Sequence, residues 1–134
     1  MKRLSVLLML IVAAGISSCK KDTCEKEKTP YELLTMDDWR LFKKKTVANG
    51  TSFSEDLNKR CVFTPGNRYY YFDANDTNFS ESGNYELNEG AMELTMDKDF
   101  GAPMTFKVAT INETEMELNY ESGPVTYVYY YKRN

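Results

Sequence analysis

Apolar and polar residues alternate along most of the chain from residue 39 onward, with the period of two that is typical of half-buried β-strands. The clearest example is the segment 92–97, in which methionine and leucine alternate with glutamate, threonine and aspartate. The pattern predicts eight strands, at residues 39–47, 60–64, 68–73, 83–87, 91–96, 104–111, 116–120 and 125–131. Residues 30–37, whose leucines and methionine offer apolar cover, predict one or two helical turns before the first strand.

Most of the predicted strands are joined by short segments rich in glycine, proline and asparagine, which is typical of β-hairpins. These segments are 65–67, 88–90, 112–113 and 122–123. Three connections are longer, at 48–58, 74–82 and 97–102, and we expect them to be loops. Sequential hairpins predict an all-β fold, an eight-stranded antiparallel meander that closes into a barrel around a packed core or one small ligand. A flat or sandwiched sheet is the alternative.

Residues 1–19 have the order of a secretory signal: a basic start, an apolar run too short to span a bilayer, and small residues at a cleavage point. The segment Ile16-Ser17-Ser18-Cys19 resembles the lipobox of bacterial lipoproteins. That resemblance implies cleavage before Cys19, acylation of this cysteine, and a membrane as partner through the attached lipid. An ordinary secretory signal with an incidental cysteine is the alternative.

Cleavage before Cys19 divides the chain into three predicted segments. They are a lipoprotein signal peptide at 1–18, a lipidated cysteine with a flexible charged tether at 19–30, and a barrel domain at 31–134. Lys20 follows the cysteine, as in lipoproteins that are released from the inner membrane. We therefore expect a lipid-anchored protein of the bacterial outer membrane, on its periplasmic or its cell-surface face. In such an oxidising compartment, Cys24 and Cys61 either form a disulfide or remain free.

Composition excludes several kinds of chemistry. The chain has no histidine, which removes Ser-His-Asp and Cys-His catalysis and the usual imidazole-bearing zinc sites. Its 17 basic and 20 acidic residues give no sign of the basic face that nucleic-acid binding requires. Glu115 and Glu117 alternate with apolar residues and should therefore point to solvent. We expect a protein that is not an enzyme and that needs no cofactor and no metal.

The segment 39–41 places a tryptophan early in the first predicted strand, and the last strand ends in aromatic and basic residues at 129–133. With the long connection after the first strand and the later hairpins, this arrangement resembles the lipocalin-like domains of small outer-membrane lipoproteins and, more distantly, the calycin barrels. The resemblance covers residues 35–133. It implies that Arg133 packs over Trp39 to close one barrel end, and that the loop 48–58 gates the mouth. Asp37 stands where calycins have glycine.

Tyrosines and methionines on the predicted inward faces are the candidates for a ligand cavity, because both side chains suit an apolar lining. These candidates are Tyr69, Tyr71, Met92, Met96, Met104, Phe106, Met116, Tyr127 and Tyr129. They support a binding module for a small apolar or amphipathic ligand, or a surface that contacts a glycan through its rings. The alternative is a barrel filled by its own side chains that acts as a non-catalytic component of an envelope complex.

Overall fold

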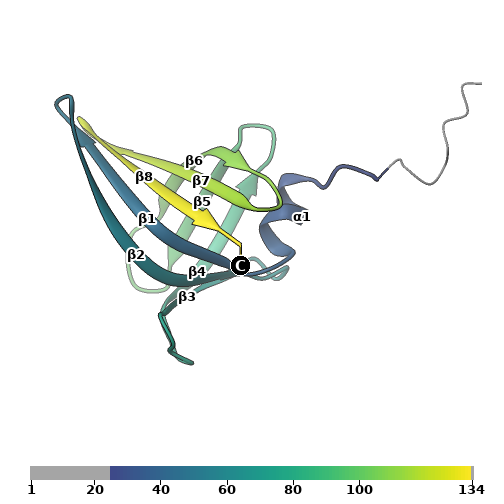
Figure 1. Ribbon diagram of the computed structural model, residues 1–134. Coiled ribbons are helices and arrows are strands. Elements are labelled where there is room, and N and C mark those ends of the chain that lie inside the picture. Colours follow the sequence, from purple (N-terminus) through teal and green to yellow (C-terminus); the bar gives the residue numbers. More distant parts are fainter. Residues whose placement is uncertain (1–24, 134) are drawn as a thin grey trace, which may run out of the picture.

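The computed structural model describes residues 25–133 and contains, in this part, one helix and eight strands (Figure 1). The elements are α1 (Pro30–Thr35), β1 (Trp39–Ala48), β2 (Thr51–Phe63), β3 (Arg68–Asp73), β4 (Phe79–Asn88), β5 (Glu93–Lys98), β6 (Met104–Ile111), β7 (Glu115–Ser122) and β8 (Val125–Lys132). Each strand pairs antiparallel with the next, and β8 pairs with β1, which closes the barrel. The predicted all-β, eight-stranded meander barrel is confirmed.

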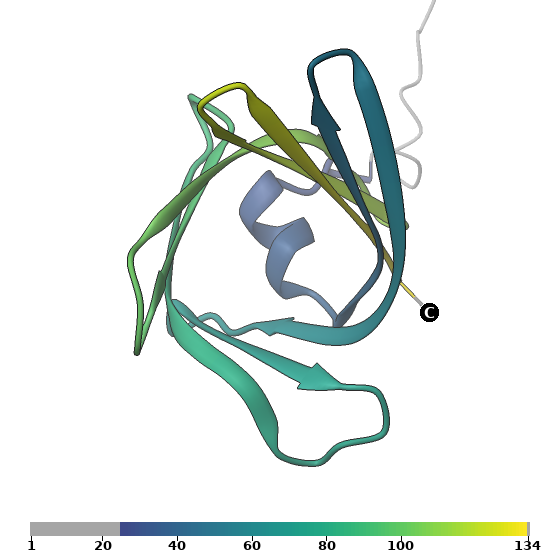
Figure 2. The same ribbon diagram turned by 90° about the vertical axis from the view of Figure 1, so that its left-hand side faces the viewer.

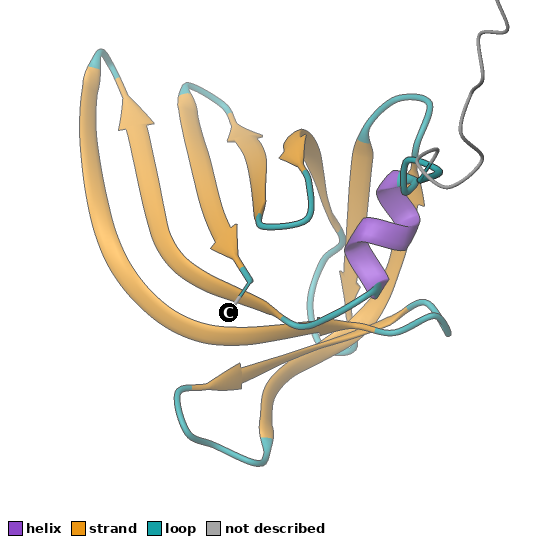
Figure 3. Ribbon diagram, turned by 45° about the vertical axis from the view of Figure 1, so that its right-hand side comes forward, coloured by secondary structure: helices purple, strands orange, loops and turns teal. Residues whose placement is uncertain are grey.

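Helix α1 lies across one end of the barrel, which we call the helix end (Figure 3). The Thr29 hydroxyl accepts a hydrogen bond from the Glu32 backbone nitrogen at 3.1 Å, and the Glu32 carboxylate accepts one from the Thr29 nitrogen at 2.8 Å. This capping box, followed by Pro30, fixes the start of the helix. Leu33 and Leu34 are buried, so the short helix is held by packing. The helical turns predicted here are confirmed.

The opposite end of the barrel, which we call the open end, carries the connections at 49–50, 74–78, 99–103 and 123–124. Figure 2 views the barrel from this end, with α1 behind the ring of strands. Because the chain is a simple meander, hairpin connections alternate between the two ends. The open end has no helix across it in the described part of the chain.

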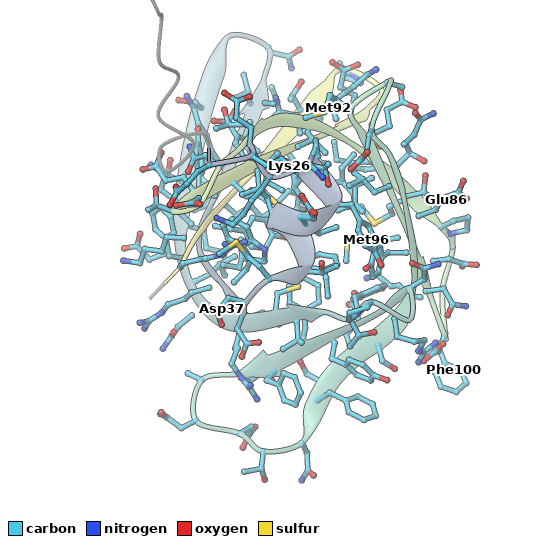
Figure 4. All side chains as sticks on the ribbon, turned by 90° about the vertical axis from the view of Figure 1, so that its right-hand side faces the viewer. Lys26, Asp37, Glu86, Met92, Met96 and Phe100 are labelled. Atoms are coloured by element: carbon cyan, nitrogen blue, oxygen red, sulfur yellow. The ribbon has the colours of Figure 1, made fainter. Side chains whose placement is uncertain are left out.

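The core is made of inward-facing residues from all eight strands together with Leu34 of α1. Seven side chains in it are almost completely buried: Leu34, Trp39, Cys61, Tyr69, Leu94, Met116 and Leu118. Figure 4 shows the alternation of faces, since Met96 points into the barrel while Glu86 and Phe100 point away from it. Burial of these large side chains is the main stabilising contribution to a small domain of this kind.

Gly83 on β4 shows how tightly the core is packed against the sheet. It lies directly opposite Tyr69 on β3. A Cβ atom at this position would come within 2.7 Å of a Tyr69 ring carbon and within 2.2 Å of the Asp97 carbonyl oxygen. Only glycine leaves space for this ring, which packs directly against the backbone of β4.

The segment 48–58 is not a loop, and the prediction there was wrong. Asn49 and Gly50 form a two-residue hairpin turn with φ values of 50° and 76°, and β2 begins at Thr51. Residues 51–56 are all exposed, because this hairpin extends beyond the body of the barrel (Figure 1). With solvent on both faces, the strand needs no apolar alternation, and its sequence therefore looks like that of a loop.

Other boundaries also differ from the prediction, and β5 extends to Lys98, inside the predicted loop 97–102. Strand β4 begins at Phe79, inside the predicted loop 74–82, and its first residues are exposed. Strand β5 begins at Glu93 rather than Ala91, because Met92 has a φ of 51° and belongs to the turn. The Asn88 side chain stabilises that turn by accepting a hydrogen bond from the Ala91 nitrogen at 3.0 Å.

Candidate functional site: a pocket at the open end of the barrel

The helix end is closed by a contact between the first and last strands. The Arg133 guanidinium lies 3.9 Å from the centroid of the Trp39 ring system, which is the contact expected from the sequence. Arg133 also donates hydrogen bonds to the carbonyl oxygens of Leu33 and Glu113. The indole nitrogen of Trp39 donates to the Leu34 carbonyl at 3.1 Å. Both side chains thus satisfy carbonyl groups that the short helix leaves free.

Burial has an electrostatic effect at this closed end. It lowers the pKa of Arg133, while the nearby carboxylates of Asp37 and Glu113 act in the opposite direction. An arginine remains charged in spite of such a shift, because its ordinary pKa is so high. The helix end is therefore closed by a cation that stacks on an indole beneath a helix.

A pocket of about 280 Å³ occupies the half of the barrel away from α1. Its apolar and aromatic walls are formed by Leu41, Leu57, Tyr71, Met96, Met104, Phe106, Tyr129 and Tyr131. Its charged lining residues are Lys44, Glu55, Lys59, Glu81 and Lys98. Seven strands, β1 to β6 and β8, contribute to this lining, so the pocket is a property of the closed barrel rather than of one hairpin.

The inner part of the pocket carries hydroxyl groups that stay neutral. The hydroxyl oxygens of Tyr71 and Tyr131 are 2.5 Å apart and share a hydrogen bond. Cys61, which is completely buried, lies directly opposite Tyr71 in the β2–β3 pair. Burial raises the pKa of all three groups well above their ordinary values. This region therefore offers uncharged hydrogen-bonding groups beside the apolar walls.

An aromatic series leads from the pocket toward the open rim. The Phe106 ring contacts Tyr129 edge-on, with 5.7 Å between centroids, and also contacts Tyr120 at 5.6 Å. Tyr120 in turn stacks on Tyr127 at 6.2 Å. Burial raises the pKa of Tyr129, so its hydroxyl is also neutral at ordinary pH. These rings form one continuous side of the mouth.

Five of the nine residues expected to line a cavity do border the pocket: Tyr71, Met96, Met104, Phe106 and Tyr129. The other four do not. Tyr69 and Met116 are buried in the core, Met92 lies in the turn before β5, and Tyr127 stands beyond the pocket near the rim. Alternation assigns the correct face of a strand, but the depth of a residue along the barrel depends on strand tilt.

Sequence reasoning missed the charged lining residues and three apolar or aromatic ones, Leu41, Leu57 and Tyr131. The signal for β2 was present, because Leu57 and Lys59 share the inward side with Cys61 and Phe63. It was overlooked because the segment was assigned to a loop. Lys44 is displaced from simple alternation by the irregularity between Leu41 and Lys43.

Several predictions fall outside the described residues. The signal peptide 1–18, the lipidation site Cys19 and the cysteine Cys24 all lie in the part of the chain of which we describe no structure. Cys61 is completely buried and forms no disulfide with any residue in 25–133. The Cys24–Cys61 disulfide therefore stays a prediction.

The described residues contain neither a metal-binding cluster nor a helix that could span a membrane. Within 25–133, no group of three or more histidine, cysteine, aspartate or glutamate side chains is placed to hold a metal ion. In the same part of the chain, α1 is too short to cross a membrane and no other helix is present.

The closed eight-stranded antiparallel meander defines the structural class of the chain. A family model for a lipocalin-like domain matches residues 36–118, which is more than half of the chain. The protein belongs to this lipocalin-like family. A crystal structure of a lipocalin-like protein from Bacteroides uniformis is similar, with 20% identity, a TM-score of 0.51, and coverage of 72% of this chain and 96% of that one. This similarity shows the fold alone. No curated protein matches the chain.

Proposed function

We propose that this protein binds a small apolar or amphipathic molecule reversibly in the open-end pocket. The observation that carries the proposal is the pocket itself, a space of about 280 Å³ inside a closed barrel. Binding sites for small molecules are typically concave, mostly apolar and supplied with a few placed polar groups, with volumes of about 300–1,000 Å³. The volume here lies just below that range, which favours a small ligand.

The lining supports an adaptable mode of binding. Met96 and Met104 offer flexible, polarisable side chains, and Phe106 and Tyr129 offer flat apolar surface. Methionine can change rotamer to fit guests of different shape. The hydroxyl pair of Tyr71 and Tyr131 supplies a polar contact that costs little to maintain when the pocket is empty, since the two groups satisfy each other.

We propose that this binding is not accompanied by catalysis. The chain has no histidine to act as a general base near neutral pH. Glu81, a carboxylate of the pocket lining, accepts a hydrogen bond from the Tyr69 hydroxyl at 3.1 Å and forms an ion pair with Lys98 at 3.0 Å. Its oxygens are therefore already engaged by neighbouring side chains.

We further propose that Cys19 is lipidated and anchors the protein in a bacterial outer membrane. The chain enters the barrel at the helix end, where Lys28 forms an ion pair with Glu113. An anchor joined to that end by a short tether would leave the pocket mouth on the opposite side, free to exchange ligand. Metabolic labelling with a clickable fatty acid tests the anchor: label should enter the wild-type protein and be absent from Cys19→Ala. Label retained by Cys19→Ala would contradict it.

Native mass spectrometry tests the binding proposal. A chain beginning at Lys20 keeps every contact described above, because the structure describes residues 25–133. We expect this chain to carry a co-purified small molecule or to be stabilised thermally by members of a panel of lipids and glycans. A matched variant, Met104→Trp, places a bulky ring in the pocket and should abolish the effect. A protein with no guest and no stabilisation by any member would instead favour a role through the outer surface.

A further inference from the structure

The charged residues of the pocket are not equally neutralised. Lys59 forms an ion pair with Asp73 at 3.3 Å, and Lys98 forms one with Glu81 at 3.0 Å. Lys44 also lines the pocket, but no carboxylate among the described residues lies within salt-bridge distance of its ammonium group. One cation of the lining is therefore left without an anion.

The surroundings of Lys44 make this charge available to a ligand. Its ammonium group lies 4.9 Å from the centroid of the Tyr127 ring and 5.6 Å from that of Tyr129. The rings hold the side chain at the mouth and remove part of its water, but they supply no formal negative charge. An ion pair formed in such a partly dehydrated place is stronger than one on an open surface.

Glu55 is the residue that could neutralise Lys44 from within the chain. It lies directly opposite Lys44 in the β1–β2 pair and also borders the pocket. Its side chain is exposed, however, and it forms no ion pair with Lys44. Lys44 is only partly exposed and instead packs on the two tyrosine rings. The carboxylate thus stays in water while the cation faces the mouth.

We infer that the ligand is an amphiphile with an acidic head group, which pairs with Lys44 at the mouth while the apolar part lies against Met96, Met104 and Phe106. This inference rests on the proposed function, because it names the class of ligand for the same pocket. A charge-assisted hydrogen bond to an ammonium group orients the ligand and selects against uncharged or cationic amphiphiles of equal length.

Three probes of equal chain length separate charge from apolar binding: decanoate, decan-1-ol and decyltrimethylammonium, each used below its micellar concentration. Isothermal titration calorimetry with the chain beginning at Lys20 gives each dissociation constant at neutral pH. We expect decanoate to bind about ten-fold or more tightly than decan-1-ol, and decyltrimethylammonium to bind most weakly. Raising the salt concentration should weaken decanoate binding and leave decan-1-ol unchanged.

Three variants assign the selectivity to one residue. Lys44→Met keeps most of the side chain but removes its charge, and it should remove the preference for decanoate without changing the affinity for decan-1-ol. Glu55→Gln should strengthen decanoate binding slightly, because it removes a negative charge that repels the carboxylate of decanoate. Lys43→Met is the matched control, because Lys43 lies over the Tyr130 ring at 4.6 Å on the same strand but does not line the pocket. It should bind all three probes as the wild type does.

The outcomes distinguish the inference from the function on which it rests. Binding of decan-1-ol and decanoate with equal affinity, or decanoate binding that survives Lys44→Met, would overturn the acidic head group while leaving the binding function intact. Tightest binding of the cationic probe, weakened by Glu55→Gln, would assign the opposite charge to the ligand. Absence of binding by all three probes would count against the function and the inference together.

Discussion

The two ends of this barrel use similar side chains for different purposes. At the helix end, Trp39 and Arg133 stack on each other and donate hydrogen bonds to three carbonyl groups, two in α1 and one in the β6–β7 turn. At the open end, Lys44 also stacks on aromatic rings, but the site around it contains space and no carboxylate partner. A cation over an aromatic ring thus closes the barrel where the space beneath it is filled, and borders an open pocket where it is not.

The largest effect should come from the closed end. Trp39→Ala removes a side chain that is 1% exposed and leaves a cavity beneath α1, so we expect the free energy of unfolding to fall by about 3–5 kcal/mol. Urea denaturation followed by circular dichroism measures the change. Phe100→Ala is the control, because this side chain is 98% exposed and should have no measurable effect. A loss below about 1 kcal/mol for Trp39→Ala would mean that the helix end is not the stable half.

Met116 and Met104 allow the helix end and the open end of the barrel to be compared with the same residue type. Met116 is 2% exposed in the core near the helix end, whereas Met104 borders the pocket. Met116→Ala should lower the free energy of unfolding by about 2–5 kcal/mol, because it opens a cavity in a packed region. Met104→Ala only enlarges existing space and should cost about 1 kcal/mol or less. Equal losses in the two variants, measured in the same urea titrations, would remove the distinction between the ends.

Gly83→Ala tests the packing between the pocket and the core. The added methyl group would overlap the Asp97 carbonyl oxygen and the Tyr69 ring, so the sheet must shift, and we expect a loss of about 1–3 kcal/mol. Gly66→Ala is the matched control, since the nearest atom to its added Cβ is 3.8 Å away. Thermal unfolding of the two variants should differ clearly. Identical midpoints would show that β4 adjusts without strain.

The smallest effect concerns acid stability at the open end. Hydrogen bonds from Arg68 and Ser82 lower the pKa of Asp99 from 3.8 to about 2. A carboxyl group whose pKa is lowered by folding stabilises the protein fully above its unfolded pKa, and this contribution is lost as the pH falls from about 4 toward 2. Asp99→Asn should therefore be slightly less stable than the wild type at pH 5 and equal to it near pH 2. A constant difference across this range in urea titrations would contradict the assignment.

The fold could be predicted because its strands bury one face, and such strands alternate apolar and polar residues. The prediction was wrong at 48–58 for the same reason, since a strand exposed to water on both faces does not need this alternation. The closing contact was predictable from the resemblance to calycin barrels, and the positions of Trp39 and Arg133 at the ends of the first and last strands agree with it. The pocket was predictable only in part. Tyr69 and Tyr71 share one face of β3, yet only Tyr71 borders the space.

Lys44 was beyond sequence reasoning for a separate physical reason. It stands in a run of three lysines, a pattern typical of a solvated strand, and the strand irregularity after Leu41 decides which of the three faces inward. Such an irregularity is an interruption of pairing between two strands, and its position depends on both of them. The charged lining residues of the pocket could therefore be identified only from the structure.

The extended β1–β2 hairpin has a consequence for association between molecules. β2 pairs with β3 only from Lys59 to Phe63, so among the described residues nothing covers the outer backbone of 51–58. Such an unpaired strand edge can template the addition of a strand from another molecule, which leads to aggregation. The polar sequence there, which includes Glu55 and Asp56, opposes this addition, because any strand pairing with it would have to accept charged side chains on both faces. The polar composition that makes this strand hard to recognise from the sequence therefore also disfavours the addition of another strand at its edge.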